Sequence, residues 1–208
     1  MEAIVKMMLR SAALMSVLCF ALPGELSAAE PQRQSLFNGK NLDGWVVTGC
    51  KAEVRSGVLF ATAGNGLIRT ANQYRDFTFE LEWRALKKEK WDAGIYFRFS
   101  ELPKSRPWPA RYQANLLQGQ EGNVNGLPTA KSSGLVKPGE WNSLRLTVVG
   151  GDAKLQMNGK MAWKSGGVKE PMGFIGIQVE VPGGGQFEYR NIYVTDLSKS
   201  PALKRNLK

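Results

Sequence analysis

The chain has 208 residues, a formal net charge of +10 at pH 7, and no histidine. The lack of histidine excludes histidine-based catalytic triads, histidine metal ligands and histidine acid–base catalysis. The basic residues are scattered along the chain and no nucleic-acid-binding motif accompanies them, so the charge does not indicate a nucleic-acid partner.

Residues 1–29 have the three parts of a secretory signal peptide. Lys6 and Arg10 form a short basic region, and an apolar run over residues 11–22 follows. A run of about a dozen residues is too short to span a membrane, which takes about 20. Small residues then offer a cleavage site after Ala29. The sequence therefore predicts export to the periplasm or the exterior, with no transmembrane segment in the mature chain.

Removal of this leader would leave Cys50 as the only cysteine, because Cys19 lies within the leader. A single thiol forms no intramolecular disulfide, so such an exported domain depends on its core for stability. The neighbours of Cys50 are typical of a loop or strand edge, and we interpret this thiol as structural rather than nucleophilic. The mature chain is long enough for one core and too short for two ordinary domains. We expect a single domain over residues 30–198 and a basic tail over residues 199–208.

After residue 30, apolar and polar residues alternate in several segments. In residues 77–84 the odd positions are apolar and the even positions polar, which predicts a strand with one face on a core and the other in water. The same alternation appears over residues 95–99, 144–148 and 175–180, and over residues 187–194 with a one-residue shift that indicates a bulge. Shorter strands are expected at residues 58–62, 66–70, 112–117 and 153–157.

Tight-turn dipeptides separate these segments, at Asn38-Gly39, Asn65-Gly66 and Asn158-Gly159. The last of these joins residues 153–157 and 160–163 in the clearest hairpin. Ten or more strands with one apolar face predict an all-β fold, a two-sheet antiparallel sandwich of the jelly-roll kind. Two long loops are expected, over residues 100–110 and 118–139, and loops of this length are usually functional or disordered.

Strand alternation also assigns polar residues to the face opposite the core. Glutamate, arginine, glutamine, asparagine and tyrosine predominate there, and these side chains hydrogen-bond sugar hydroxyls. Such a face with Trp91 or Trp108 at its rim suits a carbohydrate. The alternative is that the face is polar merely because it meets water. The predicted outward set is Thr78, Glu80, Glu82, Arg84, Tyr96, Arg98, Arg111, Gln113, Asn115, Gln178, Glu180, Glu188 and Arg190.

Candidate acid–base groups are carboxylates. Glu80 and Glu82 are two apart on one strand, so their carboxylates would lie roughly 7 Å apart on one face, and paired carboxylates are the minimum for glycoside chemistry. Glu180, on another strand, is a further candidate acid or base. Zinc is disfavoured because no cysteine or histidine ligand set is present. No cofactor is predicted, but a structural calcium ion held by carboxylates and carbonyl oxygens would leave little trace in the sequence, so that alternative stays open.

An ordered set of motifs over residues 35–196 resembles the 3-keto-disaccharide hydrolase family, which is common among exported bacterial proteins. No single motif is decisive, whereas the ordered set is specific. The motifs are SLFNGKNLDGW (35–45), YRDF (74–77), ELEWR (80–84), AGIYFR (93–98), GEWN (139–142), MNG (157–159), IGIQ (175–178) and YRNI (189–192).

This resemblance implies a concanavalin- or laminin-G-like jelly roll and action on glycosides oxidised at C3 of the sugar. The 3-keto group acidifies the C2 proton, so a base can remove it and expel the C1 substituent, with water added afterwards. Such chemistry needs a base, a group that stabilises an enolate, and a proton donor. Glu82, Arg98 and Glu180 are the candidates for these roles. The candidate substrate contacts are Glu80, Arg84, Tyr96, Trp108, Gln113, Asn115, Gln178 and Arg190.

The chain departs from the family pattern at three places. Family members commonly have Tyr-Glu-Val-Gln where this chain has YQAN over residues 112–115, so a carboxylate is replaced by Gln113 and a glutamine by Asn115. Asp92 stands where asparagine is usual, and Glu180 where many members have histidine. Three hypotheses therefore stay open: an enzyme acting on 3-keto-glycosides, a non-catalytic carbohydrate-binding module on the same fold, and a structural or interaction domain.

Overall fold

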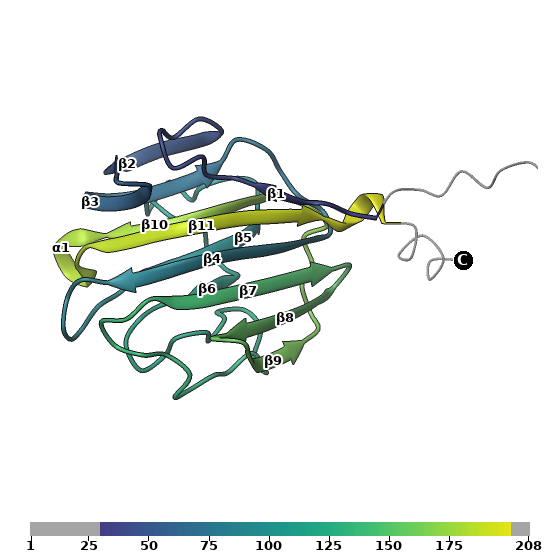
Figure 1. Cartoon of the computed structure of the whole chain (residues 1–208). Coiled ribbons are helices and arrows are strands. Elements are labelled where there is room, and N and C mark those ends of the chain that lie inside the picture. Colours follow the sequence, from purple (N-terminus) through teal and green to yellow (C-terminus); the bar gives the residue numbers. More distant parts are fainter. Residues whose placement is uncertain (1–29, 201–208) are drawn as a thin grey trace, which may run out of the picture.

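The computed structural model describes residues 30–200 of the chain (Figure 1). The predicted signal peptide, and the predicted tail after residue 200, lie outside the described residues. Eleven strands and two short helices follow in order: β1 (Arg33–Ser35), β2 (Trp45–Arg55), β3 (Val58–Thr70), β4 (Phe77–Ala85), β5 (Gly94–Phe99), β6 (Gln113–Asn115), β7 (Asn142–Val149), β8 (Asp152–Met157), β9 (Lys160–Ser165), β10 (Phe174–Glu180), α1 (Val181–Gly184), β11 (Phe187–Asp196) and the 3-10 helix η1 (Leu197–Lys199).

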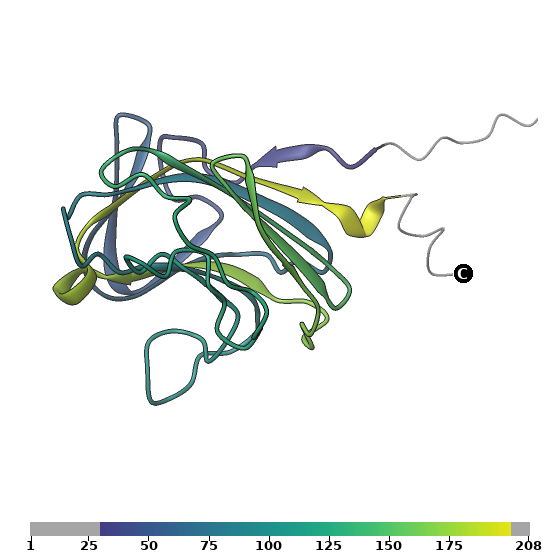
Figure 2. The same cartoon turned by 90° about the horizontal axis from the view of Figure 1, so that it is seen from below.

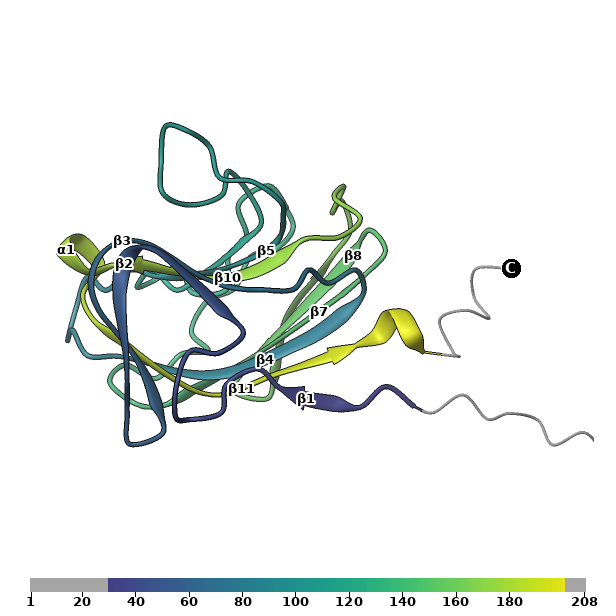
Figure 3. The ribbon, with the colours of Figure 1, turned by 90° about the horizontal axis from the view of Figure 1, so that it is seen from above.

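The strands form one antiparallel sheet in the order β6-β5-β10-β3-β11-β4-β7-β8-β9, with β2 on β3 and β1 on β11. The sheet curls because β3 pairs with β10 through residues 65–69 and with β11 through residues 59–61. Two layers result, which face each other in Figures 2 and 3. We call them the β5–β10 layer (β6, β5, β10 and the end of β3) and the β4–β11 layer (the start of β3, then β11, β4, β7, β8 and β9).

The core lies between the two layers and consists of the inward residues that alternation predicted. On β4, Phe77, Phe79, Leu81 and Trp83 are buried in it, while the polar residues between them face away. On β10, the inward residues 175, 177 and 179 are buried in the same core. The predicted all-β jelly-roll sandwich is therefore confirmed. Fully burying each aliphatic or aromatic side chain contributes about 1.5–3 kcal/mol, so this interface is the main stabilising feature.

The predicted hairpin at Asn158-Gly159 is confirmed as the β8–β9 turn. Both of its central residues have positive φ, at 50° and 75°, which is the backbone that Asn-Gly provides readily. The bulge expected in β11 is also present, because the register with β4 shifts between Arg190 and Tyr193. Asn191 in that bulge has φ 52°.

Other sequence predictions need correction. Residues 58–62 and 66–70 belong to one long strand, β3, and Asn65-Gly66 is not a turn. A side chain at Gly66 would place Cβ 2.0 Å from the Thr48 carbonyl oxygen, so this glycine serves a close approach of β2 to β3. Strands β1 and β2 were not predicted, and β6 covers only three of residues 112–117.

The two long loops contain turns but no helix or strand, and the second loop has one isolated bridge, between Val124 and Ala114. Among residues 30–200, neither described helix has the length and apolar character required to cross a membrane.

Candidate functional site

The outer face of the β5–β10 layer carries a compact group of polar side chains. In the strand register, Gln113 lies opposite Tyr96, Tyr96 opposite Gly176, and Gly94 opposite Gln178. Directly opposite residues of neighbouring antiparallel strands point to the same face. We call the group formed by Asp92, Tyr96, Gln113, Gln178 and Glu180 the Gln178 site.

A chain of hydrogen bonds crosses this site. The Gln113 side-chain amide donates to Gln178 Oε1, and Gln178 Nε2 donates to Glu180 Oε2 at 3.0 Å. The Gln113 side chain reaches Gln178 by lying over Gly94, where a Cβ would come within 2.1 Å of Gln113 Nε2. Gln178 is only 4% exposed, so its orientation is fixed by its two neighbours.

Two carboxyl groups with raised pKa values flank this chain. Burial raises the pKa of Asp92. Burial, and secondarily the charge of Asp92, raise the pKa of Glu180. The Asp92 backbone is held against α1, since its N–H donates to the Gly184 carbonyl at 3.0 Å. A carboxylate with a raised pKa is a stronger base than a free one, which suits it to proton transfer.

Tyr96 lies beside this carboxyl pair. Burial chiefly raises the pKa of its hydroxyl far above the ordinary value, the charge of Arg106 opposes this pKa shift, and the charges of Asp92 and Glu180 add to it. The Tyr96 hydroxyl therefore stays protonated and can donate a hydrogen bond to a ligand.

The 100–110 loop covers part of the same face. Leu102 and Trp108 pack against a cluster formed by Leu67, Tyr96 and Phe99. The structure thus brings Trp108 next to Tyr96 of the Gln178 site.

Asn115 also lies on this face, opposite Gly94. Its Oδ1 accepts a hydrogen bond from the Leu117 N–H at 2.8 Å, so the side chain is used in a local turn at the end of β6.

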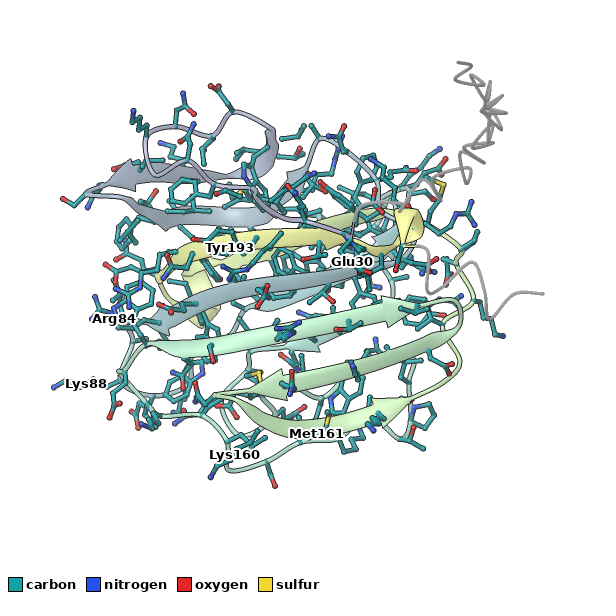
Figure 4. The ribbon with its side chains drawn as sticks, turned by 45° about the vertical axis from the view of Figure 1, so that its right-hand side comes forward. Glu30, Arg84, Lys88, Lys160, Met161 and Tyr193 are labelled. Carbon is teal, nitrogen blue, oxygen red and sulfur yellow. The ribbon has the colours of Figure 1, made fainter. Side chains whose placement is uncertain are left out.

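Glu80, Glu82, Arg84 and Arg190 lie on the outer face of the other layer. The sequence analysis placed them on the same trough as Glu180, but β4 and β11 pair with each other in the β4–β11 layer. Figure 4 shows this face, with Arg84 and Tyr193 labelled.

The three glutamates of β4 and β11 on that face, Glu80, Glu82 and Glu188, each have an arginine partner. Arg190 Nε donates to Glu82 at 2.6 Å, and Arg33 Nε donates to Glu80 at 2.8 Å. Arg84 pairs with Glu188. The two Glu candidates of β4 are therefore separated from Glu180 by the core and neutralised locally.

Arg98 lies in neither group. The register between β5 and β10 shifts at this residue, so Arg98 is the extra residue of a bulge, with φ 55°. Its side chain is 1% exposed and its Nη2 lies 3.2 Å from Asp76 Oδ1, while Nη1 donates to the Glu170 carbonyl. The bulge turns the guanidinium away from Tyr96, contrary to the simple alternation used to predict its face.

Sequence reasoning noted Asp92 only as a departure from the family pattern and gave it no role in the site, and it missed Arg106. Asp92 precedes β5, and its position two residues before Gly94 was the available signal, since Gly94 faces the site. Arg106 lies in a loop without periodicity, so no sequence pattern could place it.

Cys50 lies on edge strand β2, and burial chiefly raises the pKa of its thiol, which agrees with an unreactive thiol.

Solved structures with similar folds come from several kinds of protein. A proposed glycosyl hydrolase from Parabacteroides distasonis superposes with a TM-score of 0.65 at 18% identity, over 79% of this chain and 94% of that chain. The carbohydrate-binding module CBM66 from Bacillus subtilis gives a TM-score of 0.58 at 15% identity, covering 73% and 95%. A Bacillus subtilis protein of unknown function with a galectin-like fold gives 0.57 at 10% identity, covering 81% and 97%. These similarities establish the jelly-roll fold.

Residues 32–195 match the family model described as the 3-keto-alpha-glucoside-1,2-lyase-like domain. The chain therefore belongs to this carbohydrate-related family, and the resemblance found in the sequence is confirmed. No curated protein matches the chain in sequence.

Proposed function

We propose that the protein is an exported enzyme that acts on 3-keto-glycosides at the Gln178 site. The observation that carries this proposal is the pair of carboxyl groups with raised pKa values, Asp92 and Glu180, beside the buried Tyr96. Membership of the family supports the substrate class, and the predicted leader supports export.

The proposed step is an elimination across C1 and C2 of the sugar. Glu180 removes the C2 proton, and the electron pair of the C2–H bond moves toward the C3 carbonyl as an enolate. Tyr96 donates a hydrogen bond to the enolate oxygen. The pair then forms the C1–C2 double bond as the C1–O bond breaks, and the leaving oxygen takes the proton back from Glu180. Water can add to the double bond afterwards, which completes a net hydrolysis.

Asp92 has a supporting part in this proposal. Its charge adds to the burial that raises the Glu180 pKa, so it increases the basicity of Glu180. Gln178, bonded to both Gln113 and Glu180, fixes the orientation of the base. Trp108 and the 100–110 loop limit access of water to the face.

A non-catalytic carbohydrate-binding module is the second candidate. It is favoured by the amides of Gln113 and Gln178, which satisfy each other and offer hydrogen bonds without acid–base chemistry. The fold similarity to CBM66 is compatible with this alternative.

The test is to incubate the purified protein with p-nitrophenyl 3-keto-α-glucoside and to follow release of p-nitrophenol. The proposal predicts enzymatic release that slows when deuterium replaces hydrogen at C2, because that bond breaks in the reaction. Saturable binding of the glycoside without release would contradict the enzyme and support the binding module. Neither binding nor release would contradict both.

A further inference from the structure

Strand β2 leaves a long edge of the sheet open. Among the described residues it pairs with β3 alone, and it is the uppermost strand in Figure 1. It has 11 residues and no proline, whereas strands are usually about 5–6 residues long. An open edge of this length can pair with another chain, because its outward backbone groups have no partner in the sheet.

The turn between β2 and β3 determines which backbone groups reach this edge. Ser56-Gly57 is a two-residue turn with positive φ at both residues, 48° and 79°, and Arg55 lies opposite Val58. A turn of this kind hydrogen-bonds the two residues that flank it, so the backbone of Arg55 faces β3. Along an antiparallel pair, residues that face the partner strand alternate with residues that face away from it.

This alternation continues along β2 to Cys50. The register shift between Lys51 and Ala52 arises because β3, not β2, has the extra residue, Thr62. The Lys51 carbonyl accepts a hydrogen bond from Thr62 Oγ1 at 3.2 Å, which places that carbonyl on the β3 side, as the alternation requires. The backbone N–H and C=O groups that point away from β3 are therefore those of Cys50, Ala52 and Val54.

The side chains of this segment form two rows. The side chains of Cys50, Ala52 and Val54 are half-buried and pack against the core. The residues between them are charged and exposed, and they are Lys51, Glu53 and Arg55. The open edge thus combines free backbone donors and acceptors with an apolar inner row and a charged outer row.

A second copy of the chain complements this edge when the two-fold axis passes through Ala52. Outward backbone groups then meet outward backbone groups, because Ala52 lies opposite its own copy and Cys50 lies opposite Val54 of the other copy. In the outer row, Lys51 of each copy lies opposite Glu53 of the other. Opposite charges at directly opposite positions stabilise a strand pair.

Other registers are less favourable. An axis at Lys51 or at Glu53 would bring like charges directly opposite each other, which destabilises a strand pair. An axis at Cys50 would pair Lys51 with Gly49, a residue with φ 69°, and an axis at Val54 would run the pairing into the turn. The open edge of β9 carries Lys160 and Lys164 and no acidic residue, so pairing of two copies there offers no ion pair.

We propose that residues 50–54 of β2 form an edge for self-association, through which two copies of the chain make an antiparallel dimer with Ala52 on the two-fold axis. A contact confined to one strand of each copy is smaller than a standard interface of about 1,200–2,000 Å², so the dimer is reversible. The dimer does not depend on the proposed activity, and turnover has no part in its test.

The first test is sedimentation velocity of the purified protein over a concentration series that reaches about 1 mM. The proposal predicts a reversible equilibrium of monomer and dimer within this range. A monomer at every concentration would overturn it.

Charge reversal tests the register. Glu53→Lys places two lysines opposite each other at both symmetry-related positions, and should weaken dimerisation by about tenfold or more. Adding Lys51→Glu restores opposite charges across the interface, so the double variant should return to within about threefold of the parental Kd. The matched control is Glu140→Lys, which makes the same charge change at an exposed glutamate outside β2 and should dimerise normally. Equal weakening in both lysine variants, no weakening in Glu53→Lys, or no recovery in the double variant would contradict the register.

Cysteine cross-linking tests the position of the axis. In a Cys50→Ala background, Ala52→Cys places the new thiol opposite its copy. The Cα atoms of a hydrogen-bonded pair are about 5.5 Å apart, within the range of about 4.4–6.8 Å found in disulfides. The matched control is Val54→Cys in the same background, because its copy lies four residues away along the strand, or about 14 Å.

Mild oxidation should give disulfide-linked dimers of the Ala52→Cys variant and none of the Val54→Cys variant on a non-reducing gel. Equal linkage in both variants, or linkage in neither, would overturn the proposal. If a variant does not fold, sedimentation of the unaltered protein still decides.

Discussion

Gly94→Ala tests whether the Gln178 site depends on the space above one glycine. The added Cβ would come within 2.1 Å of Gln113 Nε2 and 2.5 Å of Gln113 Cγ, so the Gln113 side chain must leave. The hydrogen bond from Gln113 to Gln178 Oε1 is then lost. Because Gln178 is only 4% exposed, this oxygen is left buried without that donor. An unsatisfied buried acceptor costs about 1–3 kcal/mol. For a domain of this size each kcal/mol lowers Tm by about 2–4 °C, so a loss of several degrees is expected.

The assay is urea unfolding followed by tryptophan fluorescence, in a double-mutant cycle with Gln113→Ala. Gln113→Ala removes the side chain that the new Cβ would displace, so Gly94→Ala should cost much less in that background. Gly94→Ala should keep the jelly-roll fold both alone and together with Gln113→Ala, because the group that moves is a flexible side chain. The same cost of Gly94→Ala in both backgrounds, or no cost in either, would refute the reasoning.

Three further predictions concern the pH dependence of stability, the ion pair of Glu82 in the β4–β11 layer, and the close approach of β2 to β3 at Gly66. The folded protein holds the Glu180 proton more tightly than the unfolded chain, so stability falls as pH rises from the ordinary glutamate pKa through the raised one. Glu180→Gln should therefore be more stable than the parent in urea unfolding at neutral pH. At about pH 3 it should be no more stable, because the Glu180 carboxyl of the parent is then protonated in both the folded and the unfolded state. A pH-independent difference would contradict this. Glu82→Gln breaks only a partly exposed ion pair with Arg190 and should cost no more than about 1 kcal/mol in the same assay. Gly66→Ala would place Cβ 2.0 Å from the Thr48 carbonyl, a backbone contact that cannot move aside, and should give little folded protein on gel filtration; normal yield would contradict the close approach.

The sequence predicted most strands because alternation of period two directly reports which side chains are buried. On β4, for example, every inward residue from Phe77 to Trp83 was identified in this way. The Asn158-Gly159 hairpin followed from turn chemistry alone. The joined strand β3 was missed because Asn65-Gly66 has the composition of a turn, whereas its glycine is required by the approach of β2.

The layer to which each strand belongs could not be predicted. Glu82 and Glu180 both face away from the core, and alternation alone does not distinguish one outer face from the other. That distinction depends on long-range pairing of β4 with β11 and of β10 with β5. Arg98 was misplaced for a different reason, since a bulge reverses the direction that alternation predicts.

The measurement that tests the central proposal most directly is a comparison of Glu180→Gln and Glu82→Gln turnover on the 3-keto-glucoside. The two variants make the same chemical change on the two outer faces of the sandwich. Removing a general base typically lowers the rate by about 10²–10⁴-fold, so Glu180→Gln should lose activity to this extent while Glu82→Gln retains it. Loss of activity in Glu82→Gln with full activity in Glu180→Gln would contradict the assignment of the site to the β5–β10 layer.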